Sequence, residues 1–99
     1  MLEGNLFKIK EGKVDTWKAW CNELNTTLRE DALITIKEEG NTQEVFVIFN
    51  LNDEWYTIGL GEGENVPATD REINKKHRAI SKECLEKIGK VSCLYNLKI

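Results

Sequence analysis

The feature that most limits how this chain can fold is the order of its hydrophobic patterns. Residues 4–10 alternate apolar and polar side chains as a strand does, and residues 14–39 carry apolar side chains three and four apart, as a helix does. Residues 43–49 and 54–61 are two more strand patterns, and the polar residues 50–53 between them predict a hairpin. A second helical pattern over residues 69–88 and a last strand pattern over 91–99 complete the order β-α-β-β-α-β.

Both helical patterns have recognisable beginnings or ends. The first loses its phase near Asp31, which predicts a kink or break around residue 30, and Gly40 ends it. The second opens with Thr69 and Glu72 at the spacing of a capping box, and Gly89 is expected to end it. Its inward stripe comprises Ile73, His77, Ile80, Cys84 and Ile88, with Leu85 alongside.

This order predicts an α+β domain over residues 1–99, a ferredoxin-like sandwich in which two helices cover one face of a four-stranded antiparallel sheet. The other sheet face is expected to be apolar, because residues 45–49 are apolar on both sides of the strand. A large exposed apolar face usually marks an interface, so we predict a homodimer through this face. The alternative is that the loop at residues 62–69 covers it.

Composition excludes several classes of function. A formal net charge of −3 and a pI near 5.2 disfavour binding to nucleic acid, which needs a surplus of Lys and Arg. No apolar stretch is long enough for a membrane span, and no secretory signal is recognised, so we expect a cytoplasmic protein. Cys21, Cys84 and Cys93 show no metal-ligand spacing, so we expect reduced thiols, no metal site and no cofactor.

The chain resembles a family of uncharacterised prokaryotic proteins of roughly 100 residues, a domain of unknown function with a ferredoxin-like fold. The resemblance rests on FKIKEGK at 7–13, TWKAWCNELN at 16–25, EEG at 38–40, INKKHR at 73–78 and the aromatic Tyr95. In that family the second helix begins with a His-Pro-Ile-Asp run followed by Glu-His-Arg. Matching positions are kept at Ile73, His77 and Arg78, whereas other residues stand at Arg71, Glu72, Asn74 and Lys76. More distantly, the fold resembles the dimeric α/β-barrel group. The resemblance implies a fold and a dimer and no particular reaction.

His77 is the strongest candidate for a catalytic residue, because it is the only histidine and its unperturbed pKa lies near neutrality. It could act as a general acid/base in a pocket between helix and sheet, or be a structural histidine at the edge of the core. Arg78 could bind an anionic group at the mouth of such a pocket, or lie on a solvated helix face.

Four aromatic residues are candidates for ligand binding or for the dimer interface. Trp17 and Trp20 lie three apart on the first helix, Trp17 in its buried stripe and Trp20 at its margin, where it could floor an aromatic pocket. Tyr56 and Trp55 follow the hairpin on opposite sheet faces, and either could line a cavity of the dimer or seal its interface. Core packing is the competing interpretation for both tryptophans.

Three functions are compatible with these observations. The first is a small homodimeric protein that binds a small molecule, or an accessory protein. The second is a dimeric-barrel enzyme, an isomerase or a cofactor-free oxygenase, with His77 as acid/base. The third is an interaction module for a larger partner. The sequence leaves open whether the protein is an enzyme.

Overall fold

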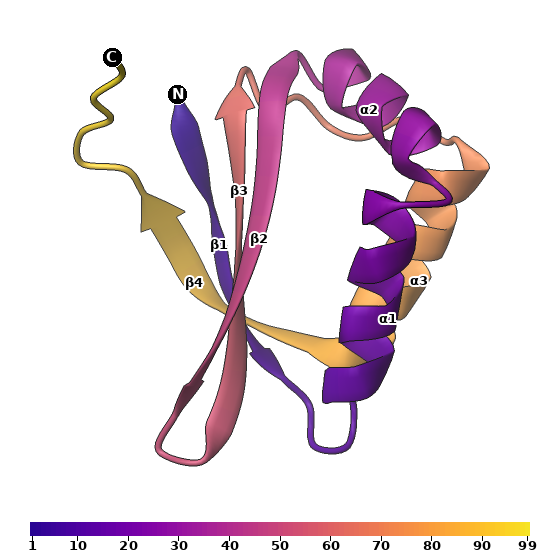
Figure 1. Cartoon of the computed structure of the whole chain (residues 1–99), viewed down its shortest axis with the longest axis vertical. Helices are drawn as coiled ribbons and strands as arrows, with labels where there is room; N and C mark the ends of the chain where they lie inside the picture. Colours follow the sequence, from indigo (N-terminus) through magenta and orange to yellow (C-terminus); the bar gives the residue numbers. More distant parts are fainter.

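The computed structural model describes residues 1–99 and contains four strands and three helices. In chain order they are β1 (Leu2–Ile9), α1 (Val14–Asn25), α2 (Arg29–Glu38), β2 (Asn41–Leu51), β3 (Glu54–Gly63), α3 (Glu72–Cys84) and β4 (Leu85–Ser92). The sheet order is β2-β3-β1-β4, and every neighbouring pair is antiparallel. All three helices lie against one face of the sheet, and the other face carries none (Figure 1).

The hairpin between β2 and β3 is confirmed and is tighter than residues 50–53 suggested. Only Asn52 and Asp53 form the turn, with φ angles of 53° and 63°. Two consecutive positive φ angles define the hairpin turn whose twist matches that of the strands, and Asn and Asp tolerate them better than most residues. This turn fixes the register along β2 and β3, and therefore which side chains of β2 face the helices.

The first helical pattern forms two helices, so the expectation of two helices in all is wrong. The break lies at residues 26–28, slightly before the predicted position near residue 30. Asn25, Thr26 and Thr27 are all weak helix formers. The Thr26 hydroxyl donates to the Asn22 carbonyl oxygen at 2.7 Å, which satisfies a carbonyl at the end of α1. A new helix then starts at Arg29 in a different direction (Figure 1).

Helix α3, which forms from the second helical pattern, begins and ends differently from the prediction. Thr69 does not form the capping box with Glu72, because its hydroxyl donates to a Glu38 carboxylate oxygen at 3.1 Å. The helix ends at Cys84, and Leu85 already has extended backbone angles. Ile88 and Gly89 belong to β4, beside the irregularity where β4 shifts its register against β1. Ile88 continued the helical spacing by coincidence and is half exposed.

The predicted last strand at residues 91–99 is also wrong. β4 takes up residues 85–92 and pairs with β1, so residues 93–99 lie beyond the sheet. This C-terminal segment projects away from the helices (Figure 1). We call residues 93–99 the tail.

The buried core lies between the helices and the sheet. Ile9, Trp17, Trp20, Cys84 and Leu85 form its fully buried cluster. Phe46 of β2 packs edge-on against Trp17 with ring centroids 5.6 Å apart, which shows that even-numbered residues of β2 face the helices. Burial of this cluster is the main source of the fold's stability.

The opposite sheet face is apolar, as predicted. By register its apolar residues are Leu2, Leu6, Val45, Val47, Phe49, Leu51, Tyr56, Ile58, Leu60 and Val91, with Lys8, Glu54, Glu62 and Glu86 toward its ends, and we call it the bare face. Phe49 and Tyr56 stack on it with ring centroids 5.4 Å apart. The 62–69 loop does not lie over it: the backbone N–H groups of Glu64 and Val66 donate to the carbonyl oxygens of Gly40 and Glu39, at the end of α2.

Candidate functional site

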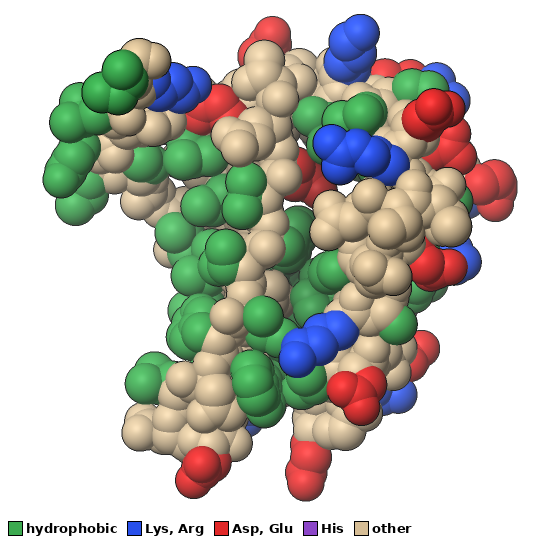
Figure 2. Space-filling view, viewed as in Figure 1, with side chains coloured by type: hydrophobic (Ala, Val, Ile, Leu, Met, Phe, Trp, Pro, Cys, Tyr) green, Lys and Arg blue, Asp and Glu red, His purple; other side chains and the backbone are tan.

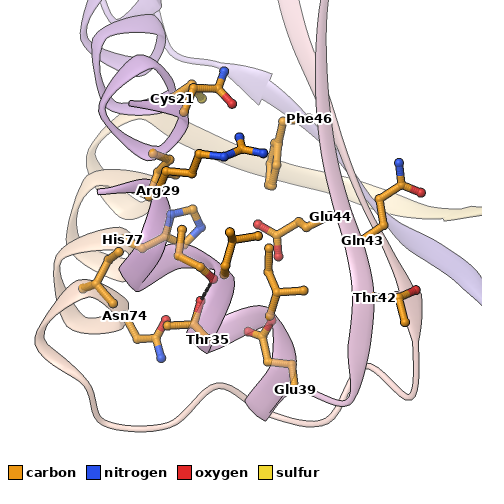
Figure 3. Close-up of a pocket in the computed structure, with 16 residues that line it drawn as sticks. Cys21, Arg29, Thr35, Glu39, Thr42, Gln43, Glu44, Phe46, Asn74 and His77 are labelled. Atoms are coloured by element: carbon orange, nitrogen blue, oxygen red, sulfur yellow. Dashed lines mark hydrogen bonds between the residues drawn. The ribbon is translucent and has the colours of Figure 1, made fainter. Parts of the chain in front are cut away.

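A cavity of about 380 Å³ opens between the helices and β2. All three helices and β2 contribute to its wall (Figure 3). Seven of the 16 lining residues are hydrophobic, and the rest include charged, amide and hydroxyl side chains. The lining side chains used below are Cys21, Arg29, Glu39, Glu44, Phe46 and His77. A concave site that combines apolar walls with several polar side chains can hold a small molecule.

His77 enters the cavity from the inward stripe of α3. The Trp20 indole N–H donates to His77 Nδ1 at 2.8 Å, and the imidazole lies 5.9 Å from the Trp20 ring and 6.3 Å from the Phe46 ring, between centroids. Because an indole can only donate, Nδ1 must accept, and the proton of the neutral ring lies on Nε2. Nε2 has no hydrogen-bond partner in the protein, so an N–H donor is available to the cavity.

The charge state of His77 is set by its surroundings. Burial lowers the pKa of His77 below its ordinary value, and the neighbouring Arg78 guanidinium lowers it further. Both effects disfavour the imidazolium form, so His77 is neutral at pH 7. It therefore presents a hydrogen-bond donor without a positive charge.

Glu44 lies on the opposite wall, on the same face of β2 as Phe46. In Figure 3 its carboxylate and the His77 ring both point into the cavity. Burial of the carboxylate raises the pKa of Glu44 to about 6, and the nearby Glu39 carboxylate adds to the increase. Glu44 as a whole residue remains exposed, because the cavity is open to water, yet the carboxylate is closely surrounded by protein. It has no ion-pair partner in the structure.

Glu39 and Cys21 are further titratable groups of the wall. Burial raises the pKa of Glu39. Burial also raises the pKa of the Cys21 thiol to about 11, with smaller contributions from Cys84 and Glu44. A thiol with so high a pKa stays protonated at pH 7 and is a poor nucleophile.

A glycine shapes the floor of the cavity. Gly59 lies beside Phe46 in the β2–β3 register, and a Cβ atom at Gly59 would lie 2.4 Å from the Phe46 ring. Only glycine lets the ring lie flat across β3 and reach Trp17 and His77. Gly59 therefore positions an aromatic wall of the cavity.

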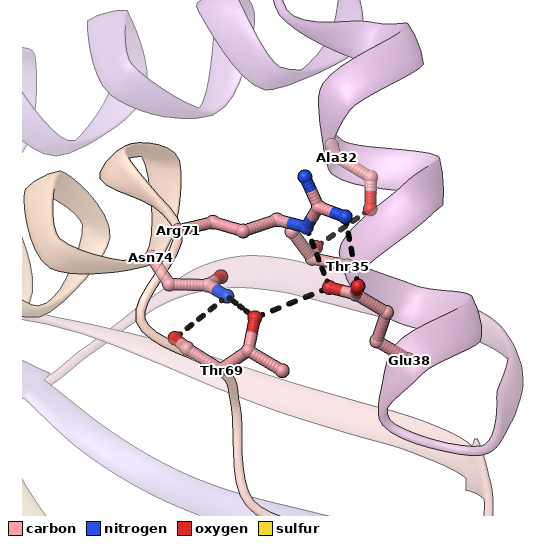
Figure 4. Close-up of polar contacts among 6 residues, drawn as sticks. All are labelled: Ala32, Thr35, Glu38, Thr69, Arg71 and Asn74. Atoms are coloured by element: carbon pink, nitrogen blue, oxygen red, sulfur yellow. Dashed lines mark hydrogen bonds and ion pairs between the residues drawn. The ribbon is translucent and has the colours of Figure 1, made fainter.

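Polar contacts close the end of the cavity near the start of α3 (Figure 4). Arg71 donates from Nε and Nη2 to the two Glu38 carboxylate oxygens at 2.7 and 2.8 Å, and Thr69 donates to one of the same oxygens. Asn74 Nδ2 donates to the Thr69 carbonyl oxygen at 3.1 Å. These contacts connect the end of α2 to the loop before α3. They hold the residues of α2 and α3 that line the cavity in place.

A sequence profile described as a family of unknown function, DUF6176, matches residues 2–98. The chain belongs to this family. Comparisons with curated proteins and with solved structures give no match. The DUF6176 match confirms a domain of unknown function and assigns no activity to the cavity.

The predicted site residues of this DUF6176 member do not all meet in one place. Trp17 and Trp20 are 2% and 1% exposed and belong to the core, although Trp20 orients His77. Tyr56 lies on the bare face, on the other side of the sheet from His77, and its hydroxyl donates to Glu54 at 2.9 Å. Arg78 pairs with Asp70 at 3.6 Å and does not line the cavity.

The charged groups that do line the cavity were not singled out in the sequence. Arg29 follows the helix break, where its side chain turns toward β2 instead of continuing the face of α1. Glu44 is a lone carboxylate inside an apolar strand on the helix-facing side, and that position was the available signal. Within residues 1–99 no helix is long and apolar enough to cross a membrane. No cluster of three His, Cys, Asp or Glu side chains is arranged to hold a metal ion.

Proposed function

We propose that this protein is a homodimer that binds a small molecule in the cavity between its helices and β2. The observation that carries the proposal is a pair of unpartnered polar groups inside that cavity, His77 Nε2–H and the Glu44 carboxylate. Both groups are reached by the water of the cavity, and polar groups left without a protein partner in a concave site are available to a ligand.

The charges of the wall favour one class of ligand. Glu39 and Glu44 each have a raised pKa from burial, and Glu39 raises that of Glu44. Arg29, the cation of the same wall, forms no ion pair with either carboxylate. An ammonium or amidinium group placed near Glu44 would relieve that repulsion and form a charge-assisted hydrogen bond. A hydrogen-bond acceptor on the same molecule would meet His77 Nε2–H. The ligand class is therefore a small amine with an apolar body and an acceptor group.

The architecture supports the dimer in this proposal. The strand order β2-β3-β1-β4, with helices on one face, supports a ferredoxin-like sandwich. Domains of this kind leave one sheet face without helices, and here that face is apolar. Two bare faces packed together would form a dimeric α/β barrel, with one cavity on the outer side of each sheet.

The proposal is tested by ligand-observed NMR with a fragment library divided into primary amines, neutral alcohols and carboxylic acids of matched size. Amines should bind more often than the other two classes. The variant Ala32→Phe places a large side chain in the cavity and removes no polar group, so it should abolish those signals. Ala79→Phe, the same change on the exposed face of α3, should leave them unchanged.

Equal binding by Ala32→Phe and the wild type would place the ligand elsewhere and contradict the proposal. Absence of binding by every class at millimolar concentration would contradict it as well. Circular dichroism of both variants is the control for folding.

A second candidate is an enzyme of the isomerase type, favoured by the pairing of His77 and Glu44. A carboxylate with a pKa of about 6 can remove a proton near neutral pH, and a neutral imidazole N–H can stabilise the oxygen anion that forms next to the resulting carbanion. In this version Glu44 is the base and His77 the hydrogen-bond donor. Deuterium exchange into hydroxyacetone in D2O, followed by NMR, tests this candidate. Exchange should require Glu44, and equal exchange rates for the wild type and Glu44→Gln would refute it.

A further inference from the structure

The tail is the most exposed apolar part of the molecule. Leu94, Tyr95 and Leu97 are 96%, 78% and 84% exposed, and Ile99 at the terminus is fully exposed. Its attachment to the sheet is a single backbone hydrogen bond, from the Cys93 N–H to the Leu2 carbonyl oxygen at 3.2 Å. Four large apolar side chains in seven residues are costly to leave in water, so this segment is suited to a partner.

The tail leaves β4 on the side of the sheet away from the helices (Figure 1). Figure 2 shows the projecting segment covered with hydrophobic side chains, and further hydrophobic side chains continue down the same side of the molecule. The tail and the bare face therefore form one apolar region. An occupant of the bare face would also meet the tail.

The bare face alone is small for a stable dimer. Its strands have 8 to 11 residues. With roughly 4.8 Å between strands and roughly 3.3 Å per residue, four such strands cover roughly 600 Å². A standard interface buries about 800 Å² on each partner. Four tail side chains, at roughly 60–120 Å² each, make up the difference.

The tail is also long enough to reach a second copy. Seven extended residues span roughly 23 Å, which exceeds the width of roughly 19 Å of a four-stranded sheet.

We propose that the tail of each copy is an arm that crosses to the second copy and packs against the sheet of that copy, so that the dimer is held by the bare faces and by two exchanged arms. This inference rests on the homodimer proposed above. It assigns to residues 93–99 a role in assembly. Leu94, Tyr95, Leu97 and Ile99 are then buried only in the dimer.

Site-specific photo-crosslinking tests the exchange directly. Tyr95 is replaced by benzoylphenylalanine, and the full chain is irradiated at a concentration at which light scattering gives the mass of a dimer. Crosslinks to the second copy produce a covalent species of twice the 11.4 kDa chain mass. Crosslinks confined to the 11.4 kDa chain would overturn the proposal. Asn96 carrying the same probe is the neighbouring control, expected to crosslink less because Asn96 is polar and is not among the four anchoring side chains.

Deletion of residues 93–99 separates this inference from the dimer itself. The shortened chain should remain folded by circular dichroism and dimerise at least 100-fold more weakly in sedimentation equilibrium. Val47→Lys, on the bare face, should also disrupt the dimer. A dimer abolished by Val47→Lys but unaffected by the deletion would refute the arm and retain the homodimer. A wild-type chain that is monomeric at 100 µM would refute both.

Discussion

Replacing Glu44 by Gln should stabilise the protein at neutral pH and leave its stability unchanged in acid. The folded-state pKa of Glu44 is raised from 4.5 to about 6, so the fold disfavours the charged carboxylate. For an acid with a raised pKa, this penalty is absent below pH 4.5, grows as pH rises from 4.5 to 6, and is constant above. A glutamine at this position stays neutral at every pH and therefore does not carry this penalty.

The size of the effect follows from that shift. A change of roughly 1.5 pKa units corresponds to at most about 2 kcal/mol at pH 7.5. Since Glu44 remains exposed to the water of the cavity, screening reduces this to about 1 kcal/mol. For a domain of this length, that is an increase in melting temperature of roughly 4–8 °C.

The assay is urea denaturation followed by tryptophan fluorescence at pH 4.0 and pH 7.5. Glu11→Gln removes the same charge from the exposed turn between β1 and α1 and should change little at either pH. If Glu44→Gln were less stable than the wild type at pH 7.5, or if its effect were the same at both pH values, the carboxylate would not be strained by burial. The interpretation of the cavity as a site that sacrifices stability for binding would then fail.

Three further predictions concern the walls of the cavity and its supports. Asn41→Ala removes two side-chain hydrogen bonds to the loop before α3 and should lower the free energy of unfolding, measured by urea denaturation, by about 2–3 kcal/mol. A loss below about 0.5 kcal/mol would contradict this prediction. Gly59→Ala forces the Phe46 ring to move and should cost about 1–3 kcal/mol, whereas an unchanged value would show that the ring adapts freely. Trp20→Phe frees Nδ1 of His77, so the His77 pKa measured by NMR should rise; an unchanged pKa would show that the indole has no part in holding the ring neutral.

The β2–β3 hairpin could be predicted because its two strand patterns are unambiguous. Residues 43–49 are rich in β-branched and aromatic side chains, and a polar turn separates them from the next strand. The apolar bare face followed from the same residues. In contrast, the end of α3 could not be read from spacing: Ile80, Cys84 and Ile88 continue a helical stripe, yet Leu85 is held extended because it pairs with Ile9 of β1. Tertiary pairing overrides the local pattern at that point.

Of the residues in the candidate site, the sequence pointed to His77 and did not distinguish Arg29 or Glu44. The reason is again that long-range structure decides which side chains face inward. His77 is unique in the sequence, so its position on the stripe of α3 was enough to place it beside the sheet. Arg29 and Glu44 are two of 31 acidic and basic residues, and nothing local distinguishes them from solvated ones. Which charged side chains face inward depends on strand register and on the direction of α2, and both are long-range properties.

The break at residues 26–28 connects the fold to the cavity. A single straight helix over residues 14–38 would extend past the core along one axis, and its later residues could not turn toward β2. Because Asn25, Thr26 and Thr27 end the first helix, α2 starts again over the end of the sheet and brings Arg29 and Glu39 to the wall opposite His77. In the sequence this break is visible only as the loss of helical phase near Asp31. In the folded chain the break opens the cavity, and the Arg71–Glu38 ion pair then holds α2 in place.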